Sequence, residues 1–314
     1  MLAQDISEFT PYVFQLLAQL LAFRPGRGLS EPYRQLFPPL LSPMLWERRG
    51  NVPALSQLLC SYVQRDVAFV CCSLQGVLGV YQKLLSSRAN EPHALRLITT
   101  LLVLAPREQM QPFLGTCMQL LLTRLQDAAR SDVAKSGLLG DRVVEDPGCK
   151  NPAFVRGLLV LLCKYATVHG GGAACDLLDA VQPGLFAQIS CNVFAKHARQ
   201  LCAAPKDAAE THRLIGGCAH LLCDPDSPLL LSAAAPGVGG AWGQLLGVAV
   251  GCVTALGSRE TAAGAAYQEE EPPESREFDS AYSRLIYGAV RVICSASASL
   301  SLSLSLSLSL SLSL

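Results

Sequence analysis

Helix starts marked by proline recur along the chain at an almost constant spacing. Pro11, Pro53 and Pro92 each lie one or two residues after a polar residue, and they are 42 and 39 residues apart. Proline is favoured in the first turn of a helix because its missing N–H would have no partner there. A fourth start, Asn151-Pro152, comes 60 residues after Pro92. A period of about 40 residues predicts a protein built from stacked pairs of helices.

Apolar residues between these starts recur three and four positions apart, as on one face of an amphipathic helix. No stretch before Ser295 alternates convincingly as a strand. The fold class that follows is all-α: a HEAT-type helical-repeat solenoid, in which helix pairs stack as a right-handed α–α superhelix. The predicted inward stripes are Phe9, Val13, Leu16, Leu17, Leu20 and Leu21; Leu55, Leu58, Leu59 and Tyr62; Leu95, Ile98 and Leu102; Met110, Phe113, Cys117, Leu120, Leu121 and Leu125; and Val155, Leu158, Leu159 and Leu162.

The composition fits a folded protein without a strong electrostatic field. Half of the residues are apolar and 16% are charged, and 25 basic residues balance 25 acidic ones. Nucleic acid is therefore excluded as a main ligand. The 13 cysteines form no CxxC pair and are expected to be reduced, with Cys60, Cys117, Cys163 and Cys252 pointing inward. The N-terminus lacks the pattern of a signal peptide, which favours a cytosolic or nuclear location.

The helical period is interrupted at two places. Residues 134–150 are rich in Gly, Asp and Pro, and residues 258–277 contain an acidic run broken by prolines. From Ser299 the chain is a Ser-Leu repeat, which translation of a thymine–cytosine dinucleotide repeat explains more simply than a strand does. The predicted organisation is HEAT-like repeats in 1–133, a loop or intron-derived insertion in 134–150, HEAT-like repeats in 151–257, an acidic linker in 258–277, a short helix in 278–294 and a low-complexity, artefactual tail in 295–314.

No recognisable pattern for covalent chemistry, metal binding or a cofactor occurs, so the chain is predicted not to be an enzyme. Cys218, His220 and Cys223, with His212 nearby, come closest to a metal site, but Cys218 and His220 point about 200° apart on a helix. Buried cysteines beside a surface histidine are the favoured interpretation. The glycine run at 170–172 is interpreted as a turn between helices rather than a phosphate cradle.

A long uncharged stretch, Ser227–Ser258, raises the question of a membrane helix. It contains Gly243, Gly247 and Gly251 in the spacing of close-packed membrane helices. Only Ala241–Leu256 is uninterrupted, and it is shorter than the ~20 residues that span a bilayer. A buried helix of the solenoid is therefore favoured. A membrane-associated helical protein anchored by residues 241–256 is the alternative.

The most specific sequence block is Leu45–Arg48 followed by Gly50–Leu55. With several others it resembles the exportin-2 family, the CAS-type importin-α re-exporters of the importin-β superfamily. The similarity is to the C-terminal part of the family and runs from about residue 5 to 287. Residues 134–150 have no recognised counterpart. The other matching blocks are Pro11–Gln15, Gly76–Asn90, Val181–Pro183 and Phe278–Leu285.

The resemblance implies a solenoid that carries importin-α out of the nucleus together with Ran-GTP and shuttles between nucleus and cytoplasm. The family's N-terminal repeats, where much of the Ran contact lies, have no counterpart here. Trp46, Glu47, Arg48 and Asn51 are candidate partner-binding residues, although packing and capping roles are the favoured interpretation. Glu269, Glu270 and Glu271 are candidates for binding a basic partner, with a solvated loop as the alternative. A general HEAT-type interaction scaffold is the broader functional alternative.

Overall fold

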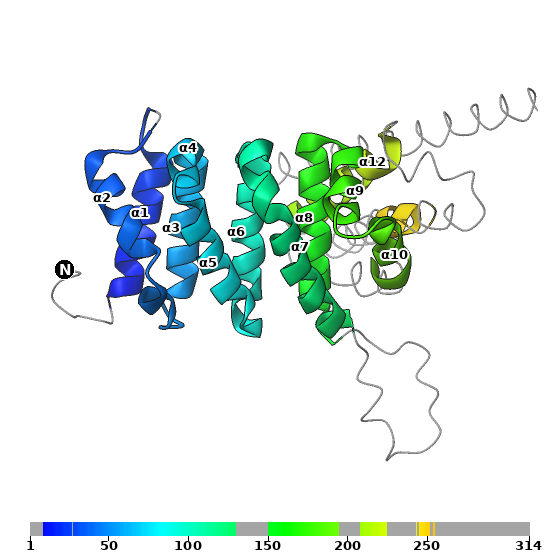
Figure 1. Ribbon diagram of the computed structural model, residues 1–314, viewed down its shortest axis with the longest axis horizontal. Helices are drawn as coiled ribbons and strands as arrows, with labels where there is room; N and C mark the ends of the chain where they lie inside the picture. The colour runs from blue at the N-terminus through cyan, green and yellow to red at the C-terminus, as the bar shows by residue number, and fades with distance from the viewer. Residues whose placement is uncertain are drawn as a thin grey trace, which may run out of the picture. The chain divides into compact units, whose positions relative to one another are not determined.

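The computed structural model describes residues 9–26, 28–129, 150–194, 208–224, 243, 245–251 and 254. Every secondary-structure element within these residues is helical, as Figure 1 shows. The predicted all-α, helical-repeat fold is therefore confirmed. The chain divides into two compact units, Met1–Arg124 and Leu125–Leu314, which we call unit 1 and unit 2.

Unit 1 repeats one arrangement of helices. Three of them begin where prolines predicted a start, with Pro11, Pro53 and Pro92 in their first turns. The first packs against the second and the second against the third, so that α1, α3 and α6 lie side by side (Figure 1). The elements of unit 1 are α1 (Thr10–Phe23), α2 (Glu31–Leu40), the 3₁₀ helix η1 (Pro43–Trp46), α3 (Val52–Arg65), α4 (Val67–Cys71), α5 (Leu74–Leu85), the 3₁₀ helix η2 (Arg88–Asn90), α6 (Glu91–Leu104) and the first part of α7 (Arg107–Ala129), which continues into unit 2.

The core of unit 1 is centred on α3. The stripe predicted for this helix, from Leu55 to Tyr62, is fully buried, because α1 and α6 flank the helix. Tyr62 contacts Phe37 of α2, with ring centroids 5.1 Å apart, and its hydroxyl donates a hydrogen bond of 2.8 Å to the backbone oxygen of Tyr33. Aromatic side chains thus connect α2 to α3. Burial raises the pKa of Tyr62 far above its usual value.

Unit 2 is built around α8, which packs against α9 and α12. Asn151 precedes α8 as predicted, and its side-chain oxygen accepts a hydrogen bond of 3.3 Å from the backbone N–H of Phe154, which caps the helix. The predicted stripe from Val155 to Leu162 is buried. The elements of unit 2 are α8 (Pro152–His169), α9 (Gly171–Asp179), α10 (Leu185–Ile189), the π-helix η4 (Ser190–Phe194) and α12 (Ala208–Cys223).

The stripe predicted for the first helix is wrong. Phe9, Leu16 and Leu20 are exposed, whereas Phe14 and Ala18 are buried together with Leu21. The buried face is rotated by roughly a quarter of a turn from the predicted one. In addition, the residue before α1 is Phe9, so Thr10, the polar residue ahead of Pro11, lies inside the helix rather than before it.

Several other predictions concern particular residues. Cys60, Cys117 and Cys163 are buried as expected, and none of the nine cysteines in the described ranges forms a disulfide. Residues 245–251 are helical, and Leu245 and Val248 are buried, in agreement with a packed helix. Several predicted segments lie outside the described residues. They are Cys252 and the other positions of 241–256 apart from 243, 245–251 and 254, the insertion before Lys150, the acidic linker, the predicted last helix and the Ser-Leu tail.

Candidate functional site

The segment between α2 and α3 carries four of the candidate partner-binding residues. It contains η1 and the turn up to Asn51, and we call Pro43–Asn51 the η1 loop. Lys83 of α5 holds the loop in place. Its ammonium group donates a hydrogen bond of 2.8 Å to the backbone oxygen of Pro43 and lies 3.4 Å from the carboxylate of Glu47. The loop is therefore fixed to the neighbouring helix, although the ion pair itself is exposed and contributes little stability.

The four candidate residues divide into two buried and two exposed side chains. Trp46 is buried, and its indole N–H donates a hydrogen bond of 2.8 Å to the backbone oxygen of Leu40. Asn51 is also buried, and its backbone oxygen accepts the first helical hydrogen bond of α3, from Leu55. Glu47 and Arg48 are exposed. The structure thus places packing residues at 46 and 51 and leaves the two charged side chains accessible to a partner.

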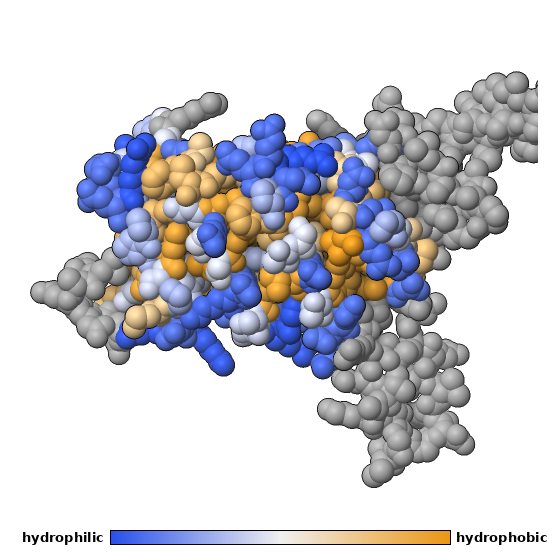
Figure 2. All heavy atoms as spheres, in the orientation of Figure 1, coloured by the Kyte–Doolittle hydropathy of each residue, from blue (hydrophilic) through white to orange (hydrophobic). Residues whose placement is uncertain are grey.

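An exposed apolar face on α1 is a second candidate, which the sequence analysis missed. Five side chains three and four positions apart, between 58% and 85% exposed, form what we call the α1 face: Phe9, Tyr12, Leu16, Leu20 and Phe23. They lie on the side of the helix opposite to the one that packs against α3. Figure 2, which colours one side of the molecule by hydropathy, shows how hydrophobic residues emerge between hydrophilic ones over the described helices.

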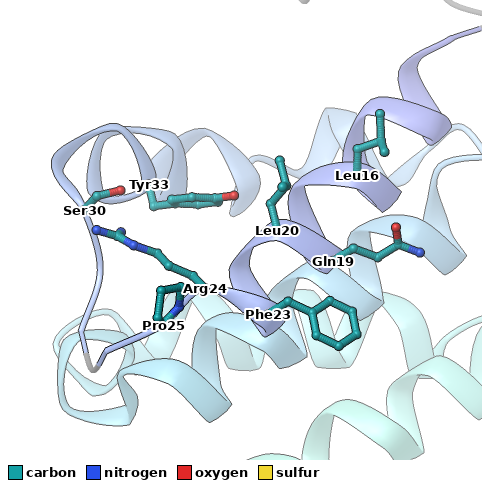
Figure 3. A pocket seen from close by; sticks show the side chains of 8 residues that line it. All are labelled: Leu16, Gln19, Leu20, Phe23, Arg24, Pro25, Ser30 and Tyr33. Atoms are coloured by element: carbon teal, nitrogen blue, oxygen red, sulfur yellow. The ribbon is translucent and has the colours of Figure 1, made fainter.

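A hollow adjoins the α1 face at the turn into α2. Its volume is about 610 Å³, and Figure 3 shows Arg24 reaching across it toward Ser30, with the ring of Tyr33 above. The Tyr33 hydroxyl donates a hydrogen bond of 3.1 Å to the backbone oxygen of Leu17, and burial raises its pKa against the opposing effect of the Arg24 cation. The hollow is apolar with one cationic edge. Its lining residues are Leu16, Gln19, Leu20, Phe23, Arg24, Pro25, Ser30 and Tyr33.

The absence of charge along α1 is the signal that could have revealed this face. None of the fourteen residues from Thr10 to Phe23 is charged, so no polar side of the helix is marked for solvent. A helix that is apolar nearly all round is normally covered on more than one side. The periodicity therefore could not distinguish the side that packs against α3 from the side that α3 leaves open.

The predicted turn at the glycine run in unit 2 consists of Gly170 alone, since Gly171 and Gly172 already belong to α9. Gly170 ends α8 with a φ of 93° and Gly171 begins α9. The carboxylate of Asp224, just after α12, accepts a hydrogen bond of 3.0 Å from the backbone N–H of Gly172. An acidic side chain of the protein thus occupies the anion-binding end of α9, where the alternative interpretation placed a phosphate.

The remaining candidates are located as follows. Glu269, Glu270 and Glu271 lie outside the described residues. Within the described ranges, no three metal-binding side chains gather in one place, and Cys218 is buried while His220 is exposed. Among the helices that the structure describes, none combines the length and the apolar character needed to cross a bilayer.

Comparisons with known proteins find similarity to exportin-2 proteins. The family described as "CAS/CSE protein, C-terminus" matches residues 1–139. Exportin-2 of Drosophila melanogaster is 35% identical over 196 residues, which are 62% of this chain and 18% of that protein. Human exportin-2 is 31% identical over 192 residues, which are 60% of this chain and again 18% of the relative.

The solved structure of the exportin Cse1 in its cargo-free, cytoplasmic state is similar with a TM-score of 0.63 at 25% identity. The similarity covers 79% of this chain and 24% of that one. This chain therefore spans only about a fifth of the length of these relatives. The resemblance predicted from the sequence is confirmed: the chain is similar to the C-terminal region of exportin-2 proteins.

Proposed function

We propose that this chain acts as part of a nuclear transport carrier that binds importin-α. The match of residues 1–139 to the C-terminal family, together with the solenoid-like packing of α1, α3 and α6, is the observation that carries the proposal. In the complete carrier, Ran-GTP binds as well, and the carrier shuttles between nucleus and cytoplasm. The function consists of binding another protein and involves no catalytic residue and no cofactor.

The η1 loop is the surface of unit 1 that we assign to a partner. Its exposed charges, Glu47 and Arg48, lie on a segment that Lys83 and the buried Trp46 hold in place, so they present a fixed pattern of charge. Fixed charges at the rim of an interface act mainly on association and specificity. The acidic run at 269–271, outside the described residues, is the second segment that we assign to a basic partner.

The α1 face has a different role in this proposal. It is the site where a further helix pair of the solenoid stacks, in the way that α1 itself stacks on α3. The support is that the match covers only 18% of the exportin-2 relative and that the matching family describes the C-terminus of such proteins. In a solenoid each repeat buries the face of its neighbour. The α1 face is thus assigned to the architecture of the carrier, and the η1 loop to its partner.

Binding to purified importin-α tests the carrier function. The immobilised chain should retain importin-α, with Ran-GTP present or absent, and removing both charges by E47A and R48A should weaken retention about three- to tenfold. E108A is the matched control, because Glu108 is another exposed acidic residue of unit 1, at the start of α7.

The possible results separate the parts of the proposal. Failure of the helical, folded chain to retain importin-α under both conditions would overturn the carrier function. If the η1-loop variant and E108A retain importin-α equally well, the carrier function stands but the η1 loop is not the contact surface.

A further inference from the structure

Two cysteine sulfurs touch in the core of unit 2. Cys163 of α8 and Cys218 of α12 are 55 residues apart in the chain, and their Sγ atoms are 3.8 Å apart. Both side chains are at most 1% exposed. Free thiols are common in protein cores as small apolar groups, but the contact of two of them from different helices is a specific chemical arrangement.

The helices that carry this pair approach unusually closely. A Cβ added to Gly217 would lie 2.1 Å from the Cβ of Cys163 and 2.4 Å from its Cα, so glycine is required at this crossing. Typical helix axes are 8–10 Å apart. Disulfide-bonded cysteines need Cα atoms about 4.4–6.8 Å apart, which only a close crossing provides. The neighbouring Gly216 has no atom near its added Cβ, so the close approach is local to Gly217.

We propose that Cys163 and Cys218 are an oxidation site, at which a peroxide converts the thiol pair into a disulfide that joins α8 to α12. In the first step one thiol, as its thiolate, attacks a peroxide oxygen and becomes a sulfenic acid while hydroxide leaves. The second sulfur then attacks the sulfenic sulfur, forms the S–S bond and releases another hydroxide. The two thiol protons convert both hydroxides to water. Two thiols and one hydrogen peroxide thus give one disulfide and two waters.

Burial determines the rate and the reversibility of this reaction. Peroxide reaches the pair only when α12 separates locally from α8, so oxidation follows the opening of this helix. When α12 packs back on α8 the resolving thiol regains contact with the oxidised sulfur, and therefore a sulfenic acid formed here closes to the disulfide before a second oxidation. In a reducing compartment the bond is transient, as disulfides of intracellular proteins usually are. The expected consequence is a unit 2 that opens less easily while it is oxidised.

Mapping of disulfides in the intact chain tests the proposal. The protein is treated with hydrogen peroxide, its remaining thiols are alkylated, and it is digested with trypsin without reduction. The peptide 157–164, which contains Cys163, should be linked to the peptide 214–259, and dithiothreitol should release it. Because that second peptide also holds Cys223 and Cys252, the mapping is repeated with both replaced by serine.

Thermal unfolding is a second measurement. The unfolding temperature of the oxidised protein should be higher by about 5–15 °C, because the disulfide cross-links a loop of 55 residues.

Matched variants test whether the disulfide forms between Cys163 and Cys218 and whether it needs the close crossing at Gly217. C163S should abolish the linked peptide, whereas C175S, at a buried cysteine of the same unit, should leave its yield within twofold. G217A should lower the yield several-fold, and G216A should not. Recovery of both Cys163 and Cys218 as alkylated thiols, under conditions that oxidise the exposed Cys72, would overturn the proposal, as would linkage of either residue to another cysteine.

Discussion

Helices α1 and α3 have the same length, and α1 is the more apolar of the two, but α3 is the one that is buried. Each contains fourteen residues and begins with a proline in its first turn. Ten residues of α3 are buried, against three of α1. The cause is the number of neighbours: α3 packs between α1 and α6, whereas within the described part of unit 1 the side of α1 opposite to α3 is open.

This difference shows how a solenoid distributes its stability. In a repeat array each module contacts only its nearest neighbours, so the same helix is a core element inside the array and a partly exposed one at its edge. The energetic value of an apolar side chain therefore depends on which repeats flank it. Paired substitutions at equivalent positions of the two helices measure that dependence directly.

The largest difference is expected for leucine truncation. Leu58 of α3 is fully buried, so L58A removes packing and leaves a cavity, at a cost of about 2–5 kcal/mol of unfolding free energy. Leu16 of α1 is 58% exposed, and L16A should change stability by at most about 0.5 kcal/mol. Urea unfolding followed by circular dichroism measures both.

Similar losses for L58A and L16A would contradict the comparison, because they would mean that the α1 face is covered in solution. Repeating the unfolding of the L16A variant at several protein concentrations identifies the cover. A loss that disappears on dilution would point to association between chains.

A smaller difference is expected for tyrosine hydroxyls. Tyr62 of α3 donates a hydrogen bond to the backbone of Tyr33, and Y62F should cost about 1 kcal/mol. Burial raises the pKa of Tyr62 in the folded protein. The contribution of Tyr62 to the free energy of unfolding is therefore complete below pH ~10, the usual pKa of tyrosine. It is lost as the pH rises further, because the hydroxyl then ionises in the unfolded chain and not in the folded one. The alkaline loss of stability should therefore be smaller in Y62F.

Tyr12 provides the control for this experiment, because it lies on the α1 face and is 63% exposed. Y12F should leave the stability at neutral pH unchanged, because it removes an exposed hydroxyl. Chemical unfolding at pH 8, 9.5 and 10.5 for the three proteins tests the expectation. An equal alkaline loss in the parent protein and Y62F would show that other groups dominate the transition.

Much of this fold follows from the sequence because it depends on local signals. Prolines that begin helices are preorganised for the first turn, and Pro53, Pro92 and Pro152 located α3, α6 and α8 correctly. The predicted buried residues were also correct where the outer side of the helix is charged or polar, as in α3. The η1 loop was recognised as a sequence block, but only the structure separates the buried Trp46 from the exposed Glu47.

What the sequence could not predict depends on neighbours. The α1 stripe failed because a helix without charges offers no local mark for its buried side, and the choice is made by contact with α3. The contact of Cys163 with Cys218 could not be predicted either, because it joins residues 55 positions apart through a close crossing at Gly217. Local spacing on a single helix, which argued against a metal at Cys218, gives no information about a second helix.

The smallest change in stability, with the clearest change in behaviour, is expected for a polar substitution on the α1 face. Leu20 is 63% exposed and lines the hollow beside Tyr33, so L20Q should alter the unfolding free energy by less than about 0.5 kcal/mol. It interrupts a continuous apolar surface, and such surfaces promote association of protein chains. Light scattering should therefore show less concentration-dependent association for L20Q than for the parent chain.

The matched substitution L59Q buries an amide in the core of α3 and should destabilise unit 1 by several kcal/mol. Unchanged association in L20Q would mean that the α1 face is not the surface through which chains meet, and the assignment of this face to helix stacking would then lose its solution evidence.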